Sequence, residues 1–133
     1  MKKRVTGVGG IFFKAKDAKA LTDWYDKHLH ISPLPHSPWG EDDDAPLFEW
    51  RDKDDPERKC YTVFAAFPEA TNEFESDFMF NFRVDDLDSV LAQLAEEGIH
   101  IEGEIREYPY GRFAYIRDPE GNRIDLWQPA KGF

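Results

Sequence analysis

The sequence predicts an α+β fold built from a duplicated module, because two residue patterns recur in the same order along its 133 residues. Phe13-Lys14-x-x-Asp17 returns as Phe82-Arg83-x-x-Asp86, 69 positions later (86 − 17). Asp55-Pro56-Glu57 returns as Asp118-Pro119-Glu120, 63 positions later (118 − 55). An amphipathic helix pattern also follows the leading strand of each half. Two matches that keep the same order of elements indicate a tandem repeat.

The first half reads as strand, helix, loop and two strands. Asp17 is a suitable N-cap for the helix, which is expected to end near Leu29. Its apolar face has the i, i+3, i+4, i+7 spacing and comprises Leu21, Trp24, Tyr25 and His28. Residues 32–46, with four prolines and the acidic run 41–44, indicate a loop. Strands are expected at residues 10–14, 47–51 and 61–67.

The second half repeats this plan after a polar segment. Asp86 is the expected N-cap, and Gly98 is expected to close the helix in the left-handed conformation. The helical stripe comprises Leu87, Val90, Leu91 and Leu94. Strands are expected at residues 78–84, 99–101, 112–116 and 123–127. We expect a single domain over residues 1–133, with module one at about 7–67, a linker at about 68–77 and module two at about 78–129.

Composition narrows the classes of partner. Hydrophobic residues make up 41% of the chain, which is enough for one core. The 27 acidic and 17 basic residues give a formal net charge of −10, which disfavours nucleic acids and anionic membranes. No apolar run approaches the roughly 20 residues that span a bilayer. The single cysteine, Cys60, cannot form an internal disulfide. These features favour a cytoplasmic protein.

Three segments carry a family resemblance. Residues 118–127, Asp-Pro-Glu-Gly-Asn-Arg-Ile-Asp-Leu-Trp, resemble the D-P-x-G-N-x-I-E-L ending of the vicinal-oxygen-chelate (glyoxalase, bleomycin resistance and extradiol dioxygenase) superfamily. Residues 81–88 and 11–17 are similar to its two module openings. The resemblance implies two βαβββ modules that form one open, cleft-bearing, barrel-like sheet. It also implies a homodimer, and the chain looks most like small bacterial glyoxalase-like proteins.

The resemblance further implies where a metal ion would bind. The four ligand positions of the metal-dependent members read Gly10, Thr62, Met79 and Asp125 here. Of these residues, only Asp125 is a good ligand, and one carboxylate does not hold a divalent ion against water. We therefore expect no metal ligand set and no cofactor. One alternative stays open, in which a divalent metal is held by Asp125 with Glu49 as the substitute ligand.

The same positions outline a cleft. Alternation along strands brings Phe12, Asn81 and Arg83 to the side of Gly10 and Met79. The candidate ligand-binding residues are Phe12, Glu49, Asn81, Arg83, Tyr115 and Trp127. Arg83 could clamp a carboxylate or phosphate, and Asp125 is the candidate catalytic base if burial raises its pKa. Alternatively, Arg83 pairs with Asp125 and the aromatic residues are core.

Two functions follow from this cleft, and the sequence leaves open whether the protein is an enzyme. The first is metal-independent binding of a small aromatic or amphipathic molecule. An acidic surface favours a cationic ligand, whereas Arg83 in the cleft favours an anion. The alternative is a lyase-type or isomerase-type enzyme that uses Asp125 as a base or as a partial metal ligand. A third reading is a structural or regulatory partner domain.

Overall fold

The computed structural model describes residues 3–35, 37–39 and 45–133. The acidic run at 41–44 lies outside these residues, so the predicted loop is described only in part. Two helices and seven strands alternate along the chain, which confirms the α+β class. In order they are β1 (Val5–Ala15), α1 (Ala18–Leu29), β2 (Leu47–Arg51), β3 (Lys59–Pro68), β4 (Phe78–Val84), α2 (Leu87–Glu96), β5 (Glu102–Tyr108), β6 (Gly111–Arg117) and β7 (Arg123–Pro129).

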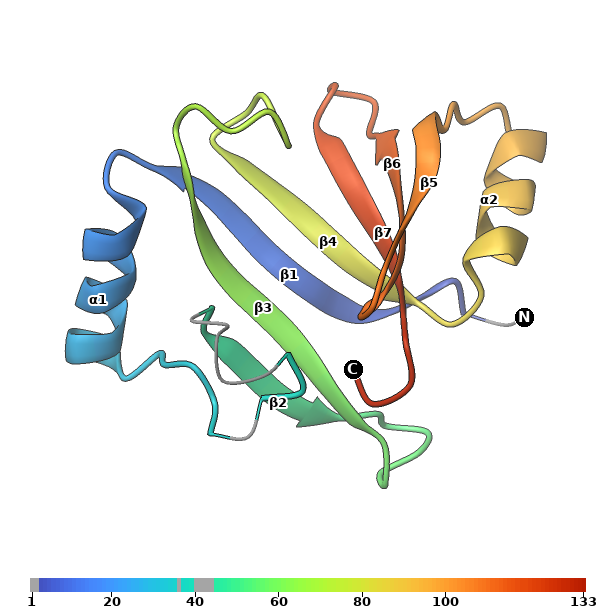
Figure 1. Cartoon of the computed structure of the whole chain (residues 1–133). Helices are drawn as coiled ribbons and strands as arrows, with labels where there is room; N and C mark the ends of the chain where they lie inside the picture. Colours follow the sequence, from blue (N-terminus) through green and yellow to red (C-terminus); the bar gives the residue numbers. More distant parts are fainter. Residues whose placement is uncertain (1–2, 36, 40–44) are drawn as a thin grey trace.

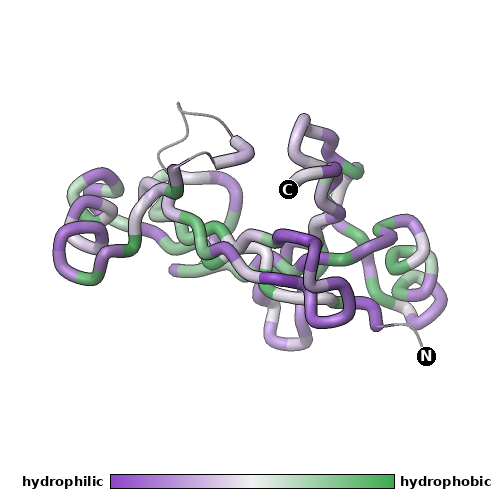
Figure 2. The backbone as a smooth tube through the Cα atoms, turned by 90° about the horizontal axis from the view of Figure 1, so that it is seen from below, coloured by the Kyte–Doolittle hydropathy of each residue, from purple (hydrophilic) through white to green (hydrophobic). Residues whose placement is uncertain are grey.

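The seven strands form one open sheet in the order β2-β3-β1-β4-β7-β6-β5. The two halves meet at the antiparallel pair β1–β4, and each of these strands pairs in parallel with the last strand of its own half. The helices lie at opposite ends of the sheet (Figure 1). Seen from below, the sheet is a thin layer between them, with the C-terminus on one side (Figure 2). The predicted open sheet is confirmed.

Both helices begin and end where the sequence predicts. The Asp17 carboxylate accepts a hydrogen bond of 3.0 Å from the amide of Ala20, and Asp86 accepts one of 3.1 Å from the amide of Ser89. These bonds satisfy amides that have no partner within the helix. Gly98 has a φ of 82°, the left-handed conformation that follows a helix end. None of the described helices is long and apolar enough to cross a bilayer.

The second half holds the well-packed core. The apolar face of α2 packs on β4, β6 and β7, and the fully buried members of this cluster are Val84, Leu87, Val90, Leu91, Ala114 and Leu126. In contrast, no residue of α1 is buried. Tyr25 of α1 contacts the rings of Phe13 and Phe64, whereas Trp24 is half exposed. Much of the predicted stripe on α1 is therefore only partly covered.

The strand predicted at residues 99–101 is wrong, because this edge of the sheet begins at Glu102 and continues to Tyr108. β5 is the outermost strand and pairs only with β6 among the described residues. An edge strand tolerates charged side chains on its open side, so β5 lacks the apolar alternation that identifies a strand. Ile105 is its single aliphatic residue.

Replacing Asp17 with alanine should lower the free energy of unfolding by about 1 kcal/mol, because the first turn of α1 loses its side-chain acceptor. Asp17→Asn should retain most of the stability, since asparagine caps nearly as well. Urea denaturation of the three proteins measures both changes. Equal losses in the two variants would show that the cap contributes little.

Candidate functional site

A pocket of about 390 Å³ lies on the inner face of the sheet. Strands of both halves contribute to it, since β1 and β3 supply one side and β4 to β7 the other. Its aromatic lining consists of Phe12, Trp39, Phe67, Tyr108, Tyr110, Phe113 and Trp127. Its polar residues are Glu73, Asn81, Arg106 and Asp125, and its smaller members are Gly9, Ala45, Leu47, Val63, Ala65 and Met79.

Several rings of the aromatic lining pack against one another. The rings of Phe113 and Trp127 are nearly parallel, with their centroids 5.8 Å apart. The indole N–H of Trp127 donates to the carbonyl oxygen of Tyr110 at 3.0 Å, which fixes the ring. Trp39 packs edge-on against Phe133 at 4.8 Å and contacts Trp127 at 5.9 Å. The pocket therefore offers fixed aromatic faces before any ligand arrives.

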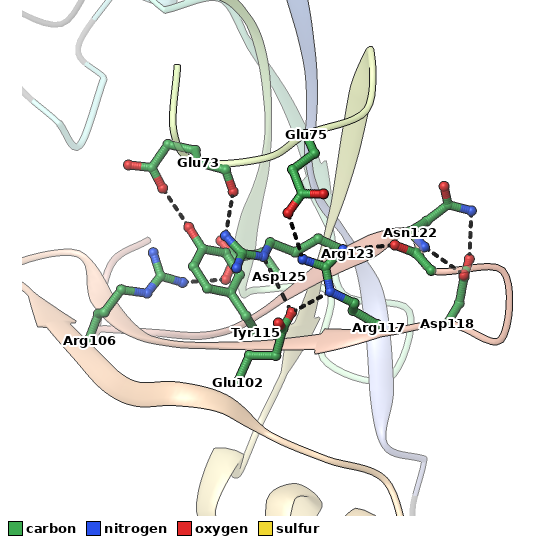
Figure 3. Close-up of polar contacts among 11 residues, drawn as sticks. Glu73, Glu75, Glu102, Arg106, Tyr115, Arg117, Asp118, Asn122, Arg123 and Asp125 are labelled. Atoms are coloured by element: carbon green, nitrogen blue, oxygen red, sulfur yellow. Dashed lines mark hydrogen bonds and ion pairs between the residues drawn. The ribbon is translucent and has the colours of Figure 1, made fainter. Parts of the chain in front are cut away.

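The polar groups of the pocket converge on Asp125. Its side chain is 5% exposed, and parallel pairing of β4 with β7 places Asn81 beside it. Arg106 Nη2 donates to Asp125 Oδ1 at 2.6 Å, and Asn81 Nδ2 donates to Asp125 Oδ2 at 3.0 Å. Both oxygens of the carboxylate thus have a donor, one from the edge strand and one from the centre of the sheet. Figure 3 shows the contact with Arg106.

Burial raises the pKa of the Asp125 carboxyl group to about 6, because the cost of removing its charge from water exceeds the stabilisation by Arg106 and Asn81. At neutral pH the group is mainly ionised, yet it titrates close to that pH. A carboxylate with this pKa, facing a pocket, has the properties of a general base.

A second layer of side chains holds Arg106 in place. The Tyr115 hydroxyl donates to the Glu73 carboxylate, and its ring lies 3.8 Å from the Arg106 guanidinium. Burial raises the pKa of Tyr115 above its usual range. Arg123 donates to the carbonyl oxygen of Glu73 at 2.9 Å (Figure 3). We call the connected charged groups the acid–arginine network: Glu73, Glu75, Glu102 and Asp125 with Arg106, Arg117 and Arg123.

A family model agrees with the fold. The Glyoxalase/Bleomycin resistance protein/Dioxygenase superfamily matches residues 7–126. The chain belongs to this superfamily.

Several solved structures share its fold at low identity. Methylmalonyl-CoA epimerase from Mycobacterium tuberculosis is 20% identical, with 98% of this chain and 92% of that chain covered and a TM-score of 0.61. A Streptomyces coelicolor methylmalonyl-CoA epimerase variant in complex with 2-nitronate-propionyl-CoA is 16% identical, with 95% and 99% covered and a TM-score of 0.67. A protein described as an NAD-dependent benzaldehyde dehydrogenase from Legionella pneumophila is 16% identical, with 89% and 96% covered and a TM-score of 0.56.

No curated protein sequence matches the chain. At these identities the likeness shows the fold alone. The similar structures carry different activity names, so the superfamily fold alone does not determine the function. The function has to be inferred from the residues of the pocket.

The structure places some of the expected superfamily site residues in the pocket and others outside it. Phe12, Asn81, Asp125 and Trp127 line the pocket, as does Met79. Three further candidates, Glu49, Arg83 and Tyr115, are not part of the lining. Tyr115 lies behind Arg106 and supports it.

The expected role of Arg83 as an anion clamp needs correction. Its side chain is buried, and its guanidinium donates to the carbonyl oxygens of Tyr61 at 3.2 Å and Phe133 at 2.8 Å. It also lies 4.8 Å from the ring of Trp127, its direct neighbour across the β4–β7 pair. Burial lowers the pKa of Arg83, although an arginine remains charged at any pH the protein meets. The expected pair of Arg83 with Asp125 does not form, because Arg106 takes that position.

Sequence reasoning missed Arg106 for a physical reason. The residue lies on β5, the strand whose charged composition concealed it. No spacing rule links Arg106 to Asp125, since the contact depends on the order of strands in the sheet. Trp39, in the proline-rich segment, carried no local signal either.

The residues present do not fit the divalent metal ion of the superfamily. An added Cβ at Gly10 would lie 2.6 Å from the Phe12 ring, so that ring fills the first ligand position. Thr62 is committed elsewhere, because its hydroxyl donates to the carbonyl oxygen of Val8 and accepts from the Trp50 indole. Met79 offers a soft thioether. At Asp125 the guanidinium of Arg106 already supplies the positive charge.

Strand pairing also corrects the position assigned to Thr62. Asn81 pairs with Asp125, and its repeat counterpart Phe12 (81 − 69) pairs with Ala65. The first-module counterpart of Asp125 is therefore Ala65, which has no donor atom in its side chain.

The alternative of a Glu49–Asp125 metal pair also needs correction. Glu49 lies outside the pocket, and its carboxylate is 3.9 Å from Lys59 Nζ. Within residues 3–35, 37–39 and 45–133, no three His, Cys, Asp or Glu side chains are grouped closely enough to hold an ion.

Asp125 should make the folded state lose stability as pH rises. The pKa of its carboxyl group is about 6 in the folded protein, against 3.8 for a fully solvated aspartate, so the folded state holds the proton more tightly. Between pH 4 and 6.5 the free energy of unfolding should therefore fall by up to about 3 kcal/mol from this group. Asp125→Asn removes the effect. Urea denaturation at several pH values gives the free energy of unfolding of both proteins. The difference between the two proteins should change across this range by the amount given above. A difference that stays constant with pH would contradict the raised pKa.

The two glycines of β1 should respond differently to alanine. An added Cβ at Gly9 would lie 2.2 Å from Asn81 Oδ1 and 2.8 Å from the Trp127 ring, both held by hydrogen bonds. Gly9→Ala should cost roughly 1–3 kcal/mol of stability, as overpacking usually does. Gly10→Ala meets only the Phe12 ring, which can rotate, and should cost less. Thermal denaturation compares them, and an equal or larger loss at Gly10 would overturn this ranking.

Proposed function

We propose that this protein binds a small organic molecule in the aromatic pocket without the help of a metal ion. The observation that carries the proposal is the division of the lining into fixed aromatic faces and one polar cluster around Asp125. Ligand sites commonly combine an apolar surface with a few convergent polar groups. A volume of about 390 Å³ suits a ligand with one or two rings.

Filling the pocket should abolish binding. Ala65 lines this pocket and also a second one, whereas Ala66 lines only the second, so Ala66 is the matched control. Ligands that raise the melting temperature of the unmodified protein in a screen of one-ring and two-ring compounds should have no effect on Ala65→Phe. They should still stabilise Ala66→Phe. A hit that stabilises both variants equally binds elsewhere and would contradict the proposed site.

A second candidate function is proton abstraction by Asp125, in a lyase-type or isomerase-type reaction. The raised pKa of this carboxyl group, about 6, favours it. Arg106, which is bound to the carboxylate, would stabilise negative charge that develops nearby. Structures of methylmalonyl-CoA epimerase share the fold, so that thioester is the first compound to test.

Solvent deuterium exchange distinguishes the two functions. Asp125→Asn should bind a pocket ligand yet lose exchange at the acidic carbon of methylmalonyl-CoA, with the unmodified rate rising with pH through about 6. Mass spectrometry measures the exchange. Exchange that persists in Asp125→Asn would exclude this carboxylate as the base.

We also propose a homodimer located in the cytoplasm, and one domain with its module boundaries at about 67 and 78. Family resemblance supports the homodimer, and the single cysteine, which cannot form an internal disulfide, supports the cytoplasm. The repeat registers of 69 and 63 positions support the module boundaries.

A further inference from the structure

We propose that the ligand of the aromatic pocket is an organic cation with an apolar body, such as a protonated aromatic amine. This inference rests on the proposed binding function and specifies the chemical class of the ligand. Three observations carry it: the charge of the polar cluster, the position of Glu73, and the aromatic faces beside both.

The positive charges near the pocket are already committed. Arg83 is buried outside the lining and donates to two backbone carbonyl oxygens. Arg106 is neutralised by Asp125 at 2.6 Å. Within the described residues, Arg106 is the one cationic side chain in the lining. An anionic ligand that took the Arg106 guanidinium from Asp125 would leave a buried carboxylate without its charged partner, which is costly.

Negative charge is in excess at the same place. Among the described residues, the pocket lining has two carboxylates, Glu73 and Asp125, and one guanidinium group, Arg106, a formal charge of 1 − 2 = −1. Glu73 brings its carboxylate to the pocket rim, where it accepts from the neutral hydroxyl of Tyr115 (Figure 3). In the described part of the chain no cation lies within ion-pair distance of this carboxylate, so its charge faces an incoming ligand uncompensated.

The aromatic lining offers a second attraction to a cation. Ring faces carry partial negative charge and bind cations, with tryptophan the strongest. Trp39 and Trp127 both line the pocket. The rings of this region already contact guanidinium groups, with Arg83 4.8 Å from Trp127 and Arg106 5.4 Å from Phe113. An ammonium group between these rings and the carboxylate of Glu73 at the rim would gain from both.

The charge of the whole protein acts in the same direction. A formal net charge of −10 raises the local concentration of cations near any cleft and lowers that of anions. The field is screened by salt, so the preference should weaken as ionic strength increases.

Three probes with one biphenyl skeleton test the charge directly: 4-phenylbenzylamine, 4-phenylbenzyl alcohol and biphenyl-4-carboxylate. At pH 7.5 they are cationic, neutral and anionic. Isothermal titration calorimetry on the full chain should show the amine binding roughly tenfold more tightly than the alcohol, and the carboxylate most weakly. The gap between amine and alcohol should shrink at high salt.

Two variants locate the effect. Glu73→Gln should weaken amine binding roughly two- to fivefold and leave alcohol binding unchanged, because its amide oxygen can still accept from Tyr115. Glu75→Gln is the matched control, since Glu75 pairs with Arg117 outside the pocket and should change neither affinity.

The outcomes separate the inference from the function on which it rests. If the alcohol or the carboxylate binds as tightly as the amine, the cation preference is overturned and small-molecule binding stands. Equal effects of Glu73→Gln and Glu75→Gln also overturn it, because the preference would then come from the general field and not from the pocket. If none of the three probes binds, the proposed binding function fails as well.

Discussion

A carboxylate removed from water must be stabilised by nearby donors, and much of the second half of this protein is arranged around that requirement. Asp125 has 5% of its side chain exposed, and isolated burial of such a charge costs several kcal/mol. Arg106 and Asn81 offset the cost, and Tyr115 holds Arg106 from behind. The same contacts tie the edge strand β5 to the sheet centre. The polar side of the pocket and the attachment of β5 therefore depend on the same buried charge.

Sequence patterns predicted the features that are local or periodic. The caps Asp17 and Asp86 and the helix-closing Gly98 each depend on neighbours within a few residues, so the chain order contains the information. Arg106 could not be found this way, since its contact requires the strand order β7-β6-β5 and a strand without apolar alternation. Arg83 was wrongly assigned to the cleft. The alternation of side chains along a strand predicts the face of the sheet on which a residue lies, but not the direction in which a long side chain extends.

The site also illustrates how a superfamily fold can keep a position and change its chemistry. The acidic residue after the Asp-Pro-Glu-Gly-Asn turn is retained as Asp125, but its positive partner is a guanidinium. At the other ligand positions, the Phe12 ring covers Gly10, and Ala65 has no donor atom in its side chain. Aromatic side chains fill the space between them. These replacements act together, because removing ligands without supplying Arg106 would leave Asp125 buried and unpaired.

The most direct test of this account is calorimetric titration of the purified, dialysed protein with nickel, zinc and manganese, alongside Asp125→Asn. We expect that neither protein binds an ion stoichiometrically, since Arg106 neutralises Asp125 and the described residues contain no group of three His, Cys, Asp or Glu side chains that could hold an ion. Binding of one ion per chain to the unmodified protein, lost in Asp125→Asn, would contradict it. That result would mean that Arg106 moves aside for a metal and that the pocket performs metal-dependent chemistry.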